Sequence, residues 1–284
     1  MTRFPGPIIP DIATSDWMAA AHGDLEALDT VLRSVEPGVR AFALRMLGNP
    51  DDADDATQEV LVRIATHLGG FRGDARFSTW VFRIARNVLL THRTRAREFP
   101  VVRFDQIAER LDAGVARGGT VSLDAQALSA EDRAEAADLA RRCLQGMLLA
   151  LGREQRLVIV LDTVFGLAAD EAADVLGVQA PAYRKRLSRA RRRLRDFLGA
   201  QCGLESPTAR CRCHRQLPAL RHEHGPGTGA RPALPQLDVD VTYDEMLEFF
   251  DALAVLRAQA RLAPNLTLSS RIREVLRAGG WLPA

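Results

Sequence analysis

"GLAADEAADVLGVQAPAYRKRLSRARRRLR", Gly166 to Arg195, is the stretch that decides the fold of this 284-residue chain. It predicts a helix, a tight turn at Gly177 and a second helix, which is the spacing of a helix-turn-helix. Pro181 is tolerated in the first turn of the second helix, where its missing N–H costs little. The two helices are expected to pack through the apolar residues Leu167, Ala168, Ala172, Val175, Leu176 and Leu187.

The second of these helices is strongly basic. It carries Arg184, Lys185, Arg186, Arg189, Arg191, Arg192, Arg193 and Arg195. So many like charges repel one another on an ordinary surface, whereas in a DNA major groove they neutralise phosphates and reach base edges. The alternatives are a solvated basic helix or a coiled-coil face. The spacing of the turn favours DNA binding over both.

Composition points to a soluble globular protein, because 47% of the residues are hydrophobic and 26% are charged. No transmembrane run and no signal peptide are recognised, so we expect a cytoplasmic protein without membrane contact. The length favours two small domains over one. The formal net charge of +2 conceals a local segregation of acidic and basic residues.

Apolar residues recur at helical spacing along the chain, with no β-rich segment and no internal repeat, so the predicted fold class is all-α. We expect two small helical domains joined by a linker, followed by a mostly helical C-terminal extension. The expected boundaries are residues 15–97 for the first domain, 98–129 for the linker, 130–199 for the helix-turn-helix domain and 200–284 for the extension. Within the extension, helical segments are predicted at 242–262 and 269–280.

An acidic stretch, "DDADDATQEV" (Asp51–Val60), follows a helix stop at Gly48-Asn49-Pro50. Asp51 or Asp52 is expected to cap the new helix, since carboxylates suit the positive end of the helix dipole. The apolar positions of this helix are expected to face the core. The acidic side chains then form either an ordinary solvated face or a surface for a basic partner.

Aromatic residues and arginines interleave in "FRGDARFSTWVFRIARN" (Phe71–Asn87), a pattern that suits binding to single-stranded nucleic acid. Phe77 and Trp80 are expected in the core. Phe71 lies in a glycine-flanked loop and is expected to be exposed. Ser78 is the predicted cap of the helix that follows.

Together, these three stretches resemble bacterial RNA polymerase sigma factors of the extracytoplasmic-function (ECF) group, the minimal kind with only regions two and four. The likeness covers residues 17–199. It implies a transcription initiation factor that directs RNA polymerase to promoters, assists strand opening and is not an enzyme. The residues that match the family's polymerase-binding motif, which docks on the β′ clamp helices, are Asp51, Asp54, Asp55, Gln58 and Glu59.

The resemblance also implies two contacts with promoter DNA. In region two, Phe71 and Asn87 fall where the family captures a flipped base, and Arg83 and Arg86 where the backbone is held. In region four, the positions that read duplex DNA are Arg184, Lys185, Ser188 and Arg189. Pro181-Ala182 replaces the family's usual glycine-threonine pair, so no promoter sequence is inferred. The implied partners are core RNA polymerase (β′ clamp helices and β flap), promoter DNA and an anti-sigma factor.

The extension contains a cluster of metal-ligand residue types: Cys202, Cys211, Cys213 and His214, with His222 and His224 downstream. Thiolates and imidazoles in this number can hold zinc or copper. A thiol redox switch and an inert surface loop are the alternatives. The extension is further expected to control activity, with its last helices either covering the Cys/His cluster or folding back on the DNA-binding domains.

A second function is weighed against the sigma factor. The chain can be a free-standing helix-turn-helix regulator with a metal- or redox-sensing tail, which would bind duplex DNA without polymerase. The sequence contains no recognisable nucleophile–base set, paired catalytic carboxylates or phosphate-binding loop, so an enzyme is not expected.

Overall fold

The computed structural model describes residues 9–91, 103–118, 127–224, 274 and 277–279. The extension segment predicted at 242–262 lies outside this part of the chain, as does most of 269–280. Within the described residues all regular structure is helical, which confirms the predicted all-α class. None of the described helices is long and apolar enough to cross a membrane.

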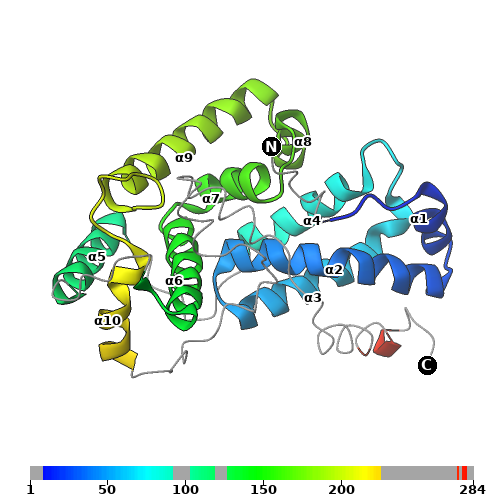
Figure 1. Ribbon diagram of the computed structural model, residues 1–284. Coiled ribbons are helices and arrows are strands. Elements are labelled where there is room, and N and C mark those ends of the chain that lie inside the picture. Colours follow the sequence, from blue (N-terminus) through cyan, green and yellow to red (C-terminus); the bar gives the residue numbers. More distant parts are fainter. Residues whose placement is uncertain (1–8, 92–102, 119–126, 225–273, 275–276, 280–284) are drawn as a thin grey trace.

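The N-terminal half is a helical bundle. Its long helices pack side by side (Figure 1). The elements are α1 (Thr14–Ala21), α2 (Leu25–Leu47), α3 (Pro50–His67), the 3-10 turn η1 (Leu68–Gly70) and α4 (Phe77–Thr91).

The caps of this bundle differ from the predicted ones. Asn49 caps α3, and its side chain accepts the N–H groups of Asp51 and Asp52. The prediction that an aspartate is the cap was wrong. Pro50 is the first residue of the helix, so the cap position falls on Asn49, before the aspartates. Ser78 lies inside α4, and its N–H and hydroxyl both donate to the carboxylate of Asp11.

The second half contains the helix-turn-helix. Its elements are α6 (Ala130–Leu149), α7 (Arg153–Ile159) running into the π-helical turn η3 (Val160–Val164), α8 (Ala169–Leu176) and α9 (Ala180–Gln201). Gly177 between α8 and α9 has a φ of 64°, a left-handed conformation that glycine adopts without a steric penalty. This is the tight turn predicted at that position.

A helix also forms inside the segment predicted as a linker. This helix, α5 (Phe104–Gly118), packs against α10 (Cys213–His224) of the extension and beside the end of α9 (Figure 1). Phe104 stacks on Phe197 with a centroid separation of 4.7 Å. Phe104, Ile107 and Leu111 recur at helical spacing and pack against the core, so the linker prediction overlooked an amphipathic helix.

The two halves share one continuous hydrophobic core. Phe42 of α2, Phe82 of α4 and Phe165 after η3 form a triangle of edge-to-face rings with centroids 5.1–5.5 Å apart. Arg45 is buried between the halves and donates to Gln145 Oε1 at 2.7 Å. Burial lowers the pKa of Arg45 to about 10, so this guanidinium is still charged at neutral pH and depends on its polar partners.

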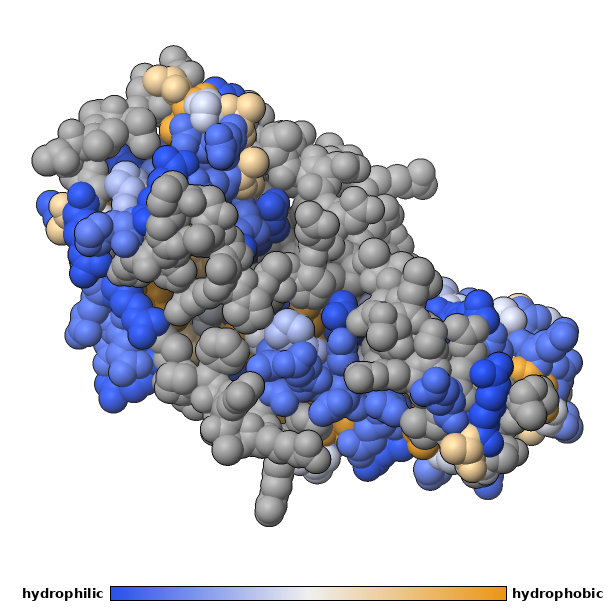
Figure 2. All heavy atoms as spheres, turned by 90° about the horizontal axis from the view of Figure 1, so that it is seen from below, coloured by the Kyte–Doolittle hydropathy of each residue, from blue (hydrophilic) through white to orange (hydrophobic). Residues whose placement is uncertain are grey.

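The described surface is mainly hydrophilic. On the face shown in Figure 2, hydrophobic residues appear only in small separate patches. Among large hydrophobic side chains of the described residues, only Met18 is exposed. The described surface is therefore dominated by charged and polar side chains.

Candidate nucleic-acid and polymerase interface

Helix α9 has one buried face and one basic face. Tyr183, Leu187, Ala190 and Leu194 recur every three or four residues and are buried. The four positions predicted to contact duplex DNA lie between them, and all are exposed: Arg184, Lys185, Ser188 and Arg189. The helix thus presents hydroxyl, ammonium and guanidinium donors on the side away from the core.

Two contacts fix the orientation of this helix. The Tyr183 hydroxyl is fully buried and donates to the carbonyl of Val158 at 3.2 Å. Arg191 pairs with Asp162 of η3 at 2.5 Å. Tyr183 directly follows Pro181-Ala182, the pair that replaces the family's usual glycine-threonine. The first turn of α9 is therefore anchored to the domain by the buried Tyr183 side chain.

The acidic side chains of α3 divide into two groups. Asp51, Asp55 and Glu59 are exposed and recur every four residues, so they lie along one side of the helix, with Gln58 half-buried beside them. Glu59 accepts from Arg63 of the same helix at 2.6 Å. Asp54 differs because its partner lies on another helix: it accepts a hydrogen bond at 2.6 Å from Nε of Arg40, whose side chain is only 8% exposed. Asp54 therefore ties α3 to α2, a role that the spacing alone did not reveal.

Phe71 lies in an aromatic cluster with Trp17, Phe77 and Trp80. Its ring centroid is 4.7 Å from that of Trp17 and 5.1 Å from that of Trp80. The residue is half-buried, so the expected exposure is only partial. Phe77 is buried as expected, at 3% exposed. Trp17, which closes the cluster from α1, was not among the predicted residues.

Arg83 of α4 and Arg76, which directly precedes α4, contact the helix-turn-helix. Arg83 pairs with the Asp174 carboxylate of α8 at 2.5 Å, and its Nε donates to the carbonyl of the same residue at 3.2 Å. Arg76 pairs with Glu171 of α8 at 2.8 Å. Asn87 is exposed and Arg86 is half-buried. Helix α8 and the segment Arg76–Arg83 are thus held together by exposed ion pairs.

The predicted metal-ligand residues separate into thiols and imidazole. Cys202, Cys211 and Cys213 line one small cavity, whose other lining residues do not include His214. His214 is buried, at 4% exposed. Among the described residues, no group of three or more His, Cys, Asp or Glu is arranged to hold a metal ion. Zinc or copper binding stays a prediction.

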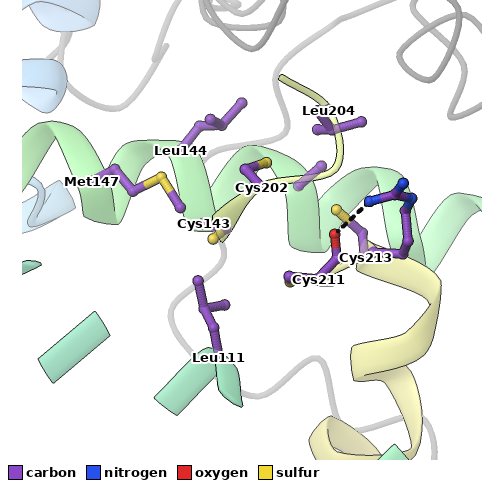
Figure 3. A pocket seen from close by; sticks show the side chains of 10 residues that line it. Leu111, Cys143, Leu144, Met147, Cys202, Leu204, Cys211 and Cys213 are labelled. Carbon is purple, nitrogen blue, oxygen red and sulfur yellow. Dashed lines mark hydrogen bonds between the residues drawn. The ribbon is translucent and has the colours of Figure 1, made fainter. Parts of the chain in front are cut away.

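Sequence reasoning missed a fourth member of this group. Cys143 of α6 lines the same cavity (Figure 3), although it lies far from the other three in the sequence. The only hint in the sequence was that Cys143 is the one cysteine outside the cluster at 202–213. Burial raises the pKa of the Cys143 thiol, and burial raises that of Cys202 to about 11.

Comparisons with known proteins agree with this arrangement. Residues 31–99 match the family model of sigma-70 region 2, and residues 141–194 match that of sigma-70 region 4. The ECF RNA polymerase sigma factor SigE of Mycolicibacterium smegmatis is 30% identical over 191 residues, which are 66% of this chain and 69% of that protein. SigW of Bacillus subtilis is 27% identical over 62% of this chain and 91% of its own length.

A solved structure, that of CnrH in complex with the cytosolic domain of CnrY, covers 66% of this chain and 96% of CnrH. The identity is 28% and the TM-score is 0.45. The family models and the relatives are sufficient without it. They support a sigma factor over a free-standing regulator, and the chain belongs to the ECF group of RNA polymerase sigma factors.

Proposed function

We propose a division of labour among three helices of this sigma factor. Helix α3 docks on the β′ clamp helices of core RNA polymerase, α4 and the preceding loop hold the opened promoter strand, and α9 reads the upstream element as duplex DNA. A sigma factor directs RNA polymerase to promoters, so core polymerase and promoter DNA are the partners that concern these surfaces. An anti-sigma factor and a contact with the β flap stay predictions.

The observation that carries the proposal is the two-sided character of α9. Its apolar side chains are buried in the core. The Tyr183 hydroxyl and the Arg191–Asp162 ion pair anchor the helix to the rest of the domain. Arg184, Lys185, Ser188 and Arg189 are left exposed on a continuous face. Arginine and lysine side chains placed in this way reach phosphates and guanine edges in a major groove.

The acidic face of α3 supports a protein partner over DNA. Asp51, Asp55 and Glu59 repel phosphates and steer towards a basic surface. We assign the docking contact to these three residues and Gln58. Asp54 is assigned a positioning role, because its carboxylate is engaged by the nearly buried Arg40.

In region two, we propose that the aromatic cluster of Phe71 forms a wall against which an unstacked base rests. Aromatic stacking contributes about 1–3 kcal/mol per base, which offsets part of the cost of unstacking. Arg86 and Asn87 lie further along α4, C-terminal to Phe77 and Trp80 of this wall. Arg83 reaches the DNA backbone only after it has released Asp174.

The protein is proposed to act in the cytoplasm, where the polymerase and the chromosome are found, and to have no enzymatic activity of its own. Both statements rest on its membership of a family of transcription initiation factors.

The docking proposal is tested with Asp55→Arg, which reverses the charge at the centre of the acidic face without touching Arg40. Binding to core polymerase is measured by competition with the unmodified protein. We expect a loss of about tenfold or more, because like charges across an interface cost over 1 kcal/mol. Glu26→Arg, an exposed acid of α2 outside this face, is the control. Equal binding of both variants would exclude the α3 face.

A further inference from the structure

The segment before α1 and α1 itself run along the loop that leads into α4. This loop, residues 71–76, joins η1 to α4. At one end, a Cβ atom at Gly69 would lie 3.8 Å from the carbonyl oxygen of Ala21, so the end of α1 packs on η1. At the other end, the side chain of Asp11 reaches Ser78. In Figure 1 the dark blue segment before α1 passes beside the start of α4.

Asp11 supplies the acceptor that the start of α4 lacks. The residue directly before the helix is Arg76, whose side chain contains no hydrogen-bond acceptor. The Asp11 carboxylate accepts the backbone N–H of Ser78 at 3.3 Å and its hydroxyl at 3.0 Å. A carboxylate placed here satisfies a free N–H group and suits the positive end of the helix dipole. It acts as a cap of α4 from a segment 67 residues away in the sequence.

The same carboxylate lies close to a cation. Its second oxygen is 3.7 Å from Nε of Arg76, which also pairs with Glu171 of α8 at 2.8 Å. The side chains of Asp11 and Arg76 are 47% and 67% exposed, so this ion pair is weak. The hydrogen bonds to Ser78 are therefore the contacts that fix the position of the loop end.

Trp17 of α1 supports the middle of the loop. Its ring centroid is 4.7 Å from that of Phe71, and its ring atoms would lie 3.6 Å from a Cβ atom at Gly73. Gly73 has a φ of 76°, a left-handed conformation that favours glycine. The Trp17 ring thus packs against Phe71 and beside the turn that follows it.

Two isoleucines hold the segment in place on either side of Asp11. Ile9 is fully buried and belongs to the hydrophobic core, and Ile12 packs against that core. Burial of large aliphatic side chains stabilises this arrangement. Because its flanks are fixed, the Asp11 carboxylate is held near Ser78 at a small cost in conformational entropy.

We propose that residues 9–17 form a brace for the loop 71–76, and that Asp11 is a positioning residue for the capture of the opened promoter strand. The inference rests on the proposed role of the Phe71 cluster in holding an unstacked base. A loop that is ordered before the strand arrives loses less conformational entropy on binding. Without the acceptor on Asp11, the start of α4 frays and Phe71 is less often in place. Asp11 acts through the loop and does not itself contact DNA in this role.

The test measures how the complete holoenzyme, formed from core RNA polymerase and the full chain, binds opened promoter DNA. The probe is a fluorescent single-stranded oligonucleotide from the opened region of a promoter fragment that the unmodified protein transcribes, and each strand is tested in turn. Asp11→Ala is expected to weaken binding of one strand by about threefold to tenfold, the size of a lost helix cap. Asp11→Asn keeps an acceptor that caps helices equally well, so it is expected to bind normally. The control Asp16→Ala removes an exposed acid of α1 whose carboxylate accepts from Ser15, and normal binding is expected.

A double-mutant cycle separates positioning from a general loss of stability. Asp11→Ala is expected to leave competition for core polymerase unchanged. In a Phe71→Ala background it is expected to cause little further loss of strand binding, because it acts through the loop that carries Phe71. If Asp11→Ala also weakens binding to core polymerase, Ser78→Ala replaces it with the same expectation, since that variant removes the hydroxyl donor to Asp11.

The brace is overturned by any of three results. One is normal strand binding by Asp11→Ala while Phe71→Ala is defective, which would leave the proposed base wall intact. Another is an equal loss in Asp11→Asn, which would assign the effect to the negative charge. The last is full additivity of Asp11→Ala with a defective Phe71→Ala. If Phe71→Ala binds normally, the proposed wall fails instead, and a loss in Asp11→Ala then still supports the brace; normal binding by both variants would contradict both.

Discussion

Two ion pairs join α8 to Arg83 of α4 and to Arg76, which directly precedes α4. Removing both is expected to make this sigma factor more active. The double variant Asp174→Asn/Glu171→Gln removes the carboxylates that hold Arg83 and Arg76. Arg83 cannot contact Asp174 and a promoter phosphate at the same time. The closed arrangement therefore competes with DNA for the same guanidinium, and weakening it favours the DNA-bound state.

The size of the effect follows from the exposure of the pairs. The side chains of Arg83 and Asp174 are 40% and 50% exposed, and those of Arg76 and Glu171 are 67% and 32% exposed. Pairs of this kind contribute about 0.2–1 kcal/mol each. Both together are worth about 0.4–2 kcal/mol, which corresponds to a shift of about twofold to thirtyfold in the equilibrium. The backbone carbonyl of Asp174 still accepts from Arg83, so the lower half of this range is expected.

Run-off transcription at a fixed amount of core polymerase measures the shift. The protein concentration that gives half of the maximal transcript is expected to fall by about twofold to eightfold, the lower half of that range, and the gain is expected to shrink at high salt. The control Asp29→Asn removes an exposed pair with Arg33 inside α2, so the two DNA-binding elements are not affected. A double variant that behaves like the control, or needs more protein, would refute the competition.

Two further substitutions test the packing that places these helices. Gly48→Ala is expected to destabilise the protein by about 1–2 kcal/mol in urea unfolding, since residue 48 has a φ of 75° and the new methyl group would lie 2.4 Å from Leu149 Cδ1; an unchanged midpoint would show that the turn is not strained. Tyr183→Phe is expected to cost about 1 kcal/mol in the same assay, because the buried Val158 carbonyl loses its hydroxyl donor. At a temperature where the Tyr183→Phe variant is folded, its promoter-dependent transcription is expected to equal that of the unmodified protein. Lower transcription at that temperature would show that the Tyr183 hydroxyl takes part in DNA reading.

Sequence periodicity was sufficient for the helix-turn-helix. Leu187 among basic residues predicts the buried side of α9, and Gly177 marks the turn. Such a pattern is local, since it depends only on the 3.6-residue repeat and on the rarity of left-handed backbone outside glycine. The prediction that Ala168 packs between the two helices was wrong, because Ala168 is exposed at the start of α8.

Contacts between distant segments were beyond prediction. Nothing in the spacing of the acidic stretch separates Asp54 from Asp55, because the difference is made by Arg40 on another helix. Cys143 joins the other thiols only through the packing of α6 against the extension. The cap at Asn49 was missed for a different reason: amide and carboxylate caps are almost equally favourable, so composition alone does not choose between neighbouring candidates.

Transcription from a promoter in the presence and absence of core RNA polymerase tests the central claim most directly. Genomic fragments are incubated with core polymerase alone, with the protein alone, and with both. The account predicts discrete transcripts only when both are present, and their loss when Arg184 and Arg189 on the exposed face of α9 are replaced by alanine. Tight binding of specific duplex fragments by the protein alone, with no transcript in the combined reaction, would contradict its role as a sigma factor.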